Sequence, residues 1–199
     1  MLDERFNILA LIIALIGGGS YIFDTLKGKI KPNKVSWFLW IIAPMIAFFA
    51  EIKQGVGLPS LLTFAAGFIP LLVFIASFVN KKSYWKIEKF DLACGTLSII
   101  GLILWQITNV GNIAIIFSIL ADGLAAIPTI AKSYREPESE SYFAFFIFSI
   151  STIITLLAIK NWTFANYAFL IYLLLIDSTL FILIKFKLGR KILRPTRSL

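Results

Sequence analysis

Histidine is absent from this chain of 199 residues, and cysteine occurs once, at Cys94. The absence of histidine excludes imidazole acid–base catalysis and histidine metal ligands. A single cysteine excludes an intramolecular disulfide, and Cys94 lies in an apolar run, where a thiol packs like a small hydrophobic group. Charged residues are also scarce, at 15% of the chain.

The short polar connections hold no glycine-rich phosphate loop, no cluster of metal-ligating side chains and no nucleophile–base pair. Acids and hydroxyl groups are the remaining polar inventory. We therefore expect a protein that is not an enzyme and that uses neither a metal nor a cofactor.

Hydrophobic residues are abundant instead, at 59% of the chain, and the mean hydropathy is +0.88. They come in seven long blocks separated by charged residues, and a membrane-crossing helix needs roughly 17–25 apolar residues. The blocks are 6–23, 35–50, 59–79, 90–108, 112–130, 142–159 and 164–184. The pattern predicts an all-α, polytopic membrane protein with seven transmembrane helices.

The positive charges lie mainly on one side of these blocks. Three lysines or arginines fall on the N-terminal side and 16 on the opposite side, which predicts an N-terminus outside the cell and a cytoplasmic C-terminus. The net charge is +8, but the basic residues flank apolar blocks. Lipid headgroups, and not nucleic acid, are therefore the expected partner of the basic tail, residues 185–199.

An internal repeat appears at a spacing of 105 residues. It pairs Pro32 with Pro137, Lys27 with Lys132, and Phe38 with Phe143 without gaps. An odd number of helices between the copies gives both the same orientation. The predicted plan is a three-helix repeat over residues 1–80, a linker helix over 81–111, and a second, parallel repeat over 112–184.

Residues 126–143 carry a recognisable motif. Pro128 and Thr129 end one helix, a basic stretch containing Lys132 follows, and Ser141 opens the next helix. This resembles the PQ-loop of the SWEET, MtN3 and PQ-loop transporter superfamily. The resemblance implies the same 3-1-3 fold, transport by alternating access between two triple-helix bundles, and a multi-pass position in the cell (inner) membrane, here of a prokaryote.

Two aspartates lie deep inside apolar blocks, Asp122 and Asp177. A charge at the bilayer centre costs about 2.5–3.5 kcal/mol, so such residues normally face a cavity or a partner. Helical spacing places Ser118 on the face of Asp122, and Asn166 on the face of Asp177. We predict that these four residues bind substrate, although an aspartate that locks two helices together would show the same pattern.

The second helix of each predicted repeat contributes an aromatic residue at equivalent depth, Trp40 and Phe145. We expect these rings to wall the substrate cavity. Gate and hinge positions are expected at residues that carry a carboxylate at a helix end or weaken a helix hydrogen bond. These are Asp24, Pro44, Pro128 and Gly17. Close packing or a fixed kink would explain the same glycine and prolines.

The leading hypothesis is a transporter of a small polar solute, cationic or accompanied by a proton. Sugars and vitamin-like nucleosides are alternative substrates, the latter because PnuC-type nucleoside carriers have a fold similar to that of the SWEET and PQ-loop superfamily. A receptor or scaffold with a seven-helix body is the alternative from another class. The expected partners are a small-molecule solute and membrane lipid, and association with further copies of the chain is left open.

Overall fold

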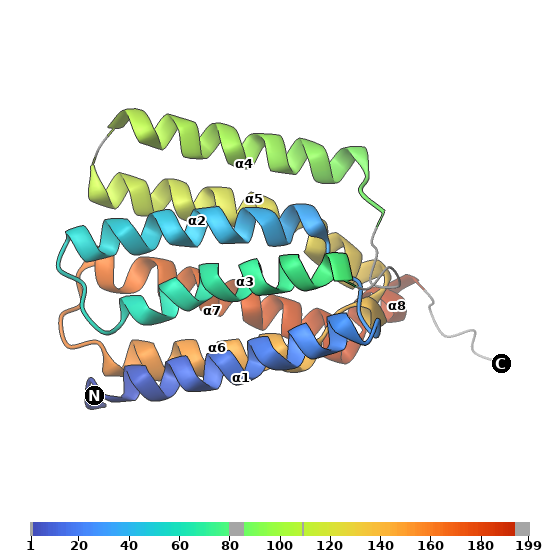
Figure 1. Cartoon of the computed structure of the whole chain (residues 1–199), viewed down its shortest axis with the longest axis horizontal. Coiled ribbons are helices and arrows are strands. Elements are labelled where there is room, and N and C mark those ends of the chain that lie inside the picture. The colour runs from blue at the N-terminus through green and yellow to red at the C-terminus, as the bar shows by residue number, and fades with distance from the viewer. Residues whose placement is uncertain (1, 80–85, 109, 194–199) are drawn as a thin grey trace.

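The computed structural model describes residues 2–79, 86–108 and 110–193, which form helices joined by short connections (Figure 1). The helices are α1 (Phe6–Leu26), α2 (Lys34–Lys53), α3 (Ser60–Val79), α4 (Lys89–Thr108), α5 (Gly111–Arg135), the 3-10 helix η2 (Pro137–Ser139), α6 (Tyr142–Ala158), α7 (Phe164–Phe186) and α8 (Leu188–Leu193). No strand occurs among the described residues, so the expected all-α fold is confirmed there.

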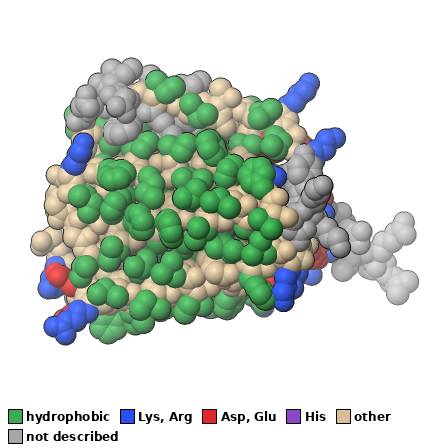
Figure 2. All heavy atoms as spheres, viewed as in Figure 1, with side chains coloured by type: hydrophobic (Ala, Val, Ile, Leu, Met, Phe, Trp, Pro, Cys, Tyr) green, Lys and Arg blue, Asp and Glu red, His purple; other side chains and the backbone are tan. Residues whose placement is uncertain are grey.

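Within the described ranges, five helices are long and apolar enough to cross a membrane, namely α1, α2, α3, α5 and α7. α6 is also apolar but has only 17 residues. Large apolar side chains point outward: Ile16, Phe49 and Leu175 are 58%, 60% and 64% exposed. Figure 2 shows hydrophobic side chains across the middle of one face and charged side chains at its two ends. This is the surface of a multi-pass membrane protein.

Each apolar segment expected from the sequence lies on one of the helices α1 to α7. Two helices are longer than their predicted blocks. α2 continues past residue 50 to Lys53, and α5 continues past residue 130 to Arg135. The hydrophobic pattern predicted neither η2 nor α8. The expected repeat boundary at residues 80–81 and the last tail residues, 194–199, lie outside the described residues.

The 105-residue spacing relates two pairs of helix bounds. Adding 105 to Phe6, where α1 begins, gives Gly111, where α5 begins. Adding 105 to Lys53, where α2 ends, gives Ala158, where α6 ends.

Gly28 explains why α1 is shorter than α5. Gly28 adopts a left-handed conformation with φ 70°, its N–H donates to the Thr25 carbonyl, and the Lys29 N–H donates to the Asp24 carbonyl. This geometry ends a helix and favours glycine. The position 105 residues later is Ser133, and there the helix continues to Arg135.

The helices pair in a pattern that recurs along the chain. α3 packs against both α1 and α2, and α7 packs against both α5 and α6. α1 also packs against α6, and α5 packs against α2. We call α1–α3 the first unit and α5–α7 the second unit. α4 lies outside both, against α5 and α2 (Figure 1).

The bundle has two distinct ends. The start of α1 and the helix α8 lie at opposite ends (Figure 1). We call the end with α8, the α1–α2 connection (27–33) and η2 the loop end. The opposite end, with the start of α1, the α2–α3 connection (54–59) and the α6–α7 connection (159–163), is the amino end.

Adjacent glycines bring α1 close to both neighbours. A Cβ at Gly17 would lie 2.9 Å from Ile147 Cγ2 on α6, and a Cβ at Gly18 would lie 2.6 Å from Ile69 Cγ2 on α3. A Cβ at Gly19 would meet nothing within 4 Å. Gly17, expected as a hinge, is therefore a close-packing position between the two units.

Candidate functional site

A cavity lies between the two units near the middle of the helices. Its lining combines aromatic rings, two carboxylates and small or aliphatic side chains. The lining residues are Ala14, Trp37, Trp40, Pro44, Leu62, Ala65, Ala66, Ile69, Pro70, Asp122, Phe145, Phe148, Thr152, Leu173, Ile176, Asp177 and Leu180. Five residues expected at the site meet here: Asp122, Asp177, Trp40, Phe145 and Pro44.

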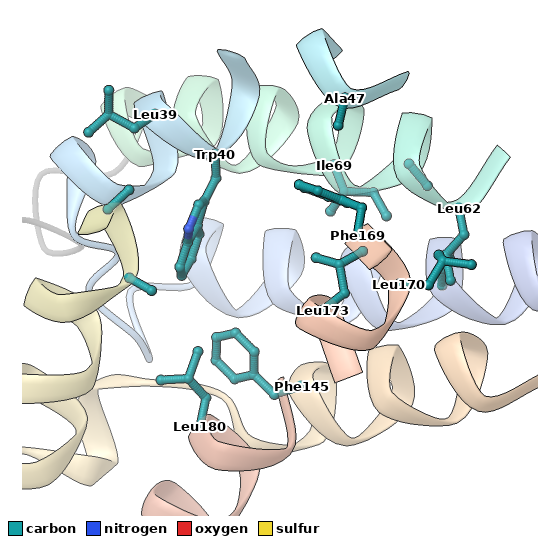
Figure 3. Close-up of a cluster of buried hydrophobic side chains, with 14 of the residues drawn as sticks. Leu39, Trp40, Ala47, Leu62, Ile69, Phe145, Phe169, Leu170, Leu173 and Leu180 are labelled. Atoms are coloured by element: carbon teal, nitrogen blue, oxygen red, sulfur yellow. The ribbon is translucent and has the colours of Figure 1, made fainter. Parts of the chain in front are cut away.

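Trp40 and Phe145, which are 105 residues apart, approach the cavity from opposite units. Figure 3 shows the indole of Trp40 on α2 and the ring of Phe145 on α6 pointing toward the same space, beside Leu173 and Leu180 of α7. The indole Nε1 of Trp40 donates a hydrogen bond to the Asp122 carbonyl, 3.3 Å away. This bond joins α2 to α5 and fixes the orientation of the ring.

Asp122 lies on α5 with only 3% of its surface exposed. Its Oδ2 accepts a hydrogen bond from the Tyr172 hydroxyl of α7 at 2.6 Å, whereas its Oδ1 has no hydrogen-bond partner in the part of the chain that the structure describes. An unpaired buried carboxylate oxygen is costly. Asp122 is therefore suited to accept a proton or a hydrogen bond from a cationic group.

Asp177 lies half-buried on α7 and lines the same cavity. It interacts electrostatically with Asp122 and with Tyr172, and it makes no hydrogen bond to the described residues. Two carboxylates that share an apolar cavity repel one another unless a cation or a proton lies between them. The pair is thus an electrostatic site for a positively charged group.

Two of the expected substrate-binding residues lie elsewhere. Asn166 lines a separate pocket at the amino end, with Glu4 and Lys160. Its Nδ2 donates to Thr163 Oγ1 at 2.7 Å in the first turn of α7, so the structure does not bring Asn166 to the cavity of Asp177. Ser118 is fully buried on α5, one turn from Asp122, and is not a lining residue.

The expected gate and hinge residues also separate. Asp24 pairs with Lys29 at 3.1 Å, within its own helix end and the connection that follows. Pro44 lines the cavity, and Pro128 is buried inside α5. Asp24 therefore makes no ion pair with the second unit among the described contacts.

A buried network joins the units at the loop end. Lys132 of α5 pairs with Glu140 at 2.6 Å, and the two side chains are 1% and 0% exposed. The Tyr21 hydroxyl of α1 donates to the other oxygen of Glu140, and Lys132 also donates to the Lys31 carbonyl. Because Tyr21 and Lys31 belong to the first unit, this network holds the two units together.

Tyr21 connects the network to the cavity. Its ring centroid lies 4.5 Å from that of Trp37 and 6.2 Å from that of Phe145. Both of these rings line the cavity. Packed rings therefore lie between the cavity and the buried ion pair at the loop end.

Four functional candidates were not predicted from the sequence. Tyr172, Tyr21 and Glu140 were not singled out, and Lys132 was noted only as part of the motif. A hydroxyl in the middle of an apolar block could have drawn attention to Tyr172 and Tyr21. Nothing in the spacing indicates that Glu140, in a short connection, folds inward.

A further acid was missed because the expected helix ended too early. Glu51 lies just past residue 50 but inside α2, and it is only 2% exposed. Its Oε1 accepts a hydrogen bond from Thr63 of α3 at 3.2 Å. Glu51 does not line the cavity, so it is a link between α2 and α3.

The helix α8 is tied to the connection that carries Glu140. Lys187 and Arg190 pair with Glu138 at 3.0 Å and 2.6 Å. The hydrogen bond from Lys187 holds the pKa of Glu138 below its usual value. These side chains are about half exposed, so the pairs position α8 more than they stabilise the fold.

No known protein family, curated protein or solved structure was found to match this chain. The functional conclusion therefore depends on the geometry of the site.

Proposed function

We propose that this protein is a membrane transporter that moves a small cationic solute by alternating access between the first and second units. The observation that carries the proposal is the cavity between the units, in which Asp122 and Asp177 meet two aromatic rings, Trp40 from the first unit and Phe145 from the second. Buried acids within apolar helices are costly, and binding a cation offsets that cost.

The recurring helix pairs support a 3-1-3 plan. In this plan α1 to α7 all cross the membrane, α4 is the linker, the N-terminus is outside and the tail is cytoplasmic. α1 and α5 begin 105 residues apart, and α2 and α6 end 105 residues apart, which favours a duplication. The plan is similar to that of SWEET and PQ-loop carriers, and we place the protein in the cell membrane of a prokaryote.

The shape and chemistry of the cavity favour a small organic cation. Its volume of ≈ 70 Å³ is room for roughly two water molecules, at about 30 Å³ each. Trp40 and Phe145 offer aromatic faces to a cation, and an ammonium or guanidinium group would satisfy Asp122 Oδ1. A neutral sugar would leave both carboxylates without a charged partner.

Two closures would alternate in transport. The Tyr21–Glu140–Lys132 network closes the cavity toward the loop end. Toward the amino end, Asn166 of α7 lines the pocket at that end, and Leu173 of the same helix lines the cavity. The buried side chains of Phe169 and Leu170 lie between these two levels of α7. Figure 3 shows Phe169 and Leu170 beside Leu173. In this mechanism, separation of the units at one end breaks one closure while the other holds.

Uptake into proteoliposomes tests the proposal. We expect uptake of small amines or guanidinium compounds, little uptake of neutral sugars or nucleosides, and loss of uptake in Asp122→Asn and Asp177→Asn. Asp91→Asn is the matched control, because Asp91 is a buried aspartate that caps the start of α4 away from the cavity.

Cation uptake that persists unchanged in both cavity variants would contradict the proposal. Thermal stabilisation by a solute without any flux would instead support a receptor or scaffold. Uptake of a sugar or a vitamin-like nucleoside that is independent of both aspartates would assign the cavity to a neutral substrate.

A further inference from the structure

Five buried oxygen atoms on α2 and α5 have no hydrogen-bond partner in the described chain. They are Ser36 Oγ on α2 and Ser118 Oγ, Asp122 Oδ1, Thr129 Oγ1 and Ser133 Oγ on α5. Each of these residues is at most 3% exposed. Buried polar atoms are nearly always satisfied, by protein or by ordered water. These atoms therefore need a ligand that can both donate and accept hydrogen bonds.

Three buried hydroxyls on α6 behave differently. Ser149, Ser151 and Thr152 on α6 each donate to the carbonyl four residues earlier, at 3.0, 3.0 and 2.9 Å. Such bonds within a helix satisfy a hydroxyl locally. The α5 hydroxyls do not make them and remain available to bind water.

The α5 oxygens share one face of the helix. Steps of four, seven and four residues from Ser118 through Asp122 and Thr129 to Ser133 keep them within about 40° of Asp122 around the axis. Asp122 faces the cavity, so this face points into the bundle. The polar face runs from the cavity toward the loop end.

Ser36 lies on the face of α2 that meets α5. It lies one turn from Trp40, whose indole is bonded to the Asp122 carbonyl, and two turns from Ala43, which packs against Ala121. Because α2 and α5 run in opposite directions, Ser36 lies on the loop-end side of Trp40, beside the interval between Asp122 and Thr129.

The distances suit bridging water. At 1.5 Å rise per residue, Asp122 and Thr129 are about 10 Å apart along α5, and Thr129 and Ser133 about 6 Å. One water with two hydrogen bonds spans about 5.5 Å. The small residues Ala125 and Ala126 occupy the longer interval, and Ser36 lies opposite.

Titratable groups stand at both ends of the row of α5 oxygens. Tyr172 bonds to Asp122, and Asp177 lines the same cavity. At the loop end, Tyr21, Glu140 and Lys132, which is next to Ser133, form the buried network. The row therefore joins the cavity acid to a polar network near the basic surface.

We propose that bound water and the hydroxyls of Ser36, Thr129 and Ser133 form a hydrogen-bonded chain that carries protons between Asp122 and the loop end. A proton from the medium joins the outermost water, each water or hydroxyl passes one proton on as it accepts another, and the last transfer forms an O–H bond at Asp122 Oδ1. Asp122 becomes neutral and the medium loses one proton. The role of this chain in coupling rests on the proposed transport function.

Infrared spectroscopy tests the chain in liposomes without any solute. The carbonyl band of protonated Asp122 is identified by its loss in Asp122→Asn, and its shift is followed after transfer into heavy water. We expect the triple variant Ser36→Ala, Thr129→Val, Ser133→Ala to slow this shift by roughly tenfold or more, as expected when a hydrogen-bonded step is lost.

Ser151→Ala is the matched control, because it removes a buried hydroxyl that bonds to a carbonyl of its own helix. In this variant the Asp122 carbonyl band should shift at the wild-type rate. Circular dichroism melting checks that each variant is folded. Equal rates in the triple variant and the wild type would overturn the proposal, as would a spectrum from which Asp122→Asn removes no carbonyl band. The infrared measurement needs no solute. Wild-type proton exchange at Asp122 together with absent solute uptake would therefore contradict the transport function and not the hydrogen-bonded chain.

Discussion

The Tyr172 hydroxyl lies 2.6 Å from Asp122 Oδ2 and thereby links α7 to α5 within the second unit. Both residues are deep in apolar helices, so this bond fixes the carboxylate while its other oxygen stays available. We expect Tyr172→Phe to weaken cation binding without abolishing it, because Asp122 keeps its charge but loses its orientation.

A poorly oriented carboxylate loses part of one charge-assisted hydrogen bond to the cation, so the dissociation constant should rise by up to about tenfold. Binding measured by titration calorimetry in detergent checks this. Tyr167→Phe is the control on the same helix, because its ring packs against Trp162 and Phe164 away from the cavity. Equal losses in the two variants would argue against a role for the Tyr172 hydroxyl.

The buried pair of Lys132 and Glu140 should show strong coupling. Lys132→Met or Glu140→Gln alone should destabilise the protein by about 3–5 kcal/mol, because each leaves an uncompensated buried group. The double variant should lose clearly less than the sum of the two. Denaturant unfolding of the four proteins measures this cycle, and additive losses would mean that the pair does not interact.

Tyr21 should control opening at the loop end. Tyr21→Phe removes its bond to Glu140 while keeping the ring contacts with Trp37 and Phe145, so we expect the units to separate more readily there. In a Cys94→Ser background, Thr129→Cys should then react faster with a small thiol reagent. Tyr142→Phe, an exposed tyrosine at the same end, should leave that rate unchanged.

Adjacent glycines on α1 provide a packing test with an internal control. Gly17→Ala should cost about 1–3 kcal/mol, because the new methyl group would overlap Ile147. Gly19→Ala has open space and should be neutral or stabilising by up to about 1 kcal/mol. Thermal unfolding of both variants decides this, and an equal effect would exclude close α1–α6 packing.

The position of α8 should depend on the charge of Glu138. Lys187 lowers the pKa of this carboxyl, so its stabilising contribution is present above its unfolded pKa and is lost as pH falls through the lower folded pKa. Glu138→Gln should release α8 at neutral pH, seen as faster tryptic cleavage after Lys187 and Arg190. Glu136→Gln, two residues away, should leave cleavage at these sites slow.

Much of the fold could be predicted because hydrophobic length and charge are local properties. The block beginning at Phe6 is helical because lipid leaves no other way to satisfy its backbone, and the positions of Asp122 and Asp177 inside such blocks mark them as costly. The 105-residue spacing, read from residues such as Pro32 and Pro137, predicts equivalent places for Trp40 and Phe145, and both residues line the cavity.

Only the tertiary structure decided which of these residues meet. Asp122 and Asp177 share one cavity, whereas Asn166 lies at the amino end and Asp24 pairs with Lys29. Glu140 folds inward to Tyr21 and Lys132 although it lies in a connection. Helical spacing fixes the face of a side chain on its own helix, but the partner across that face depends on how seven helices pack, and packing is not a local property of the chain.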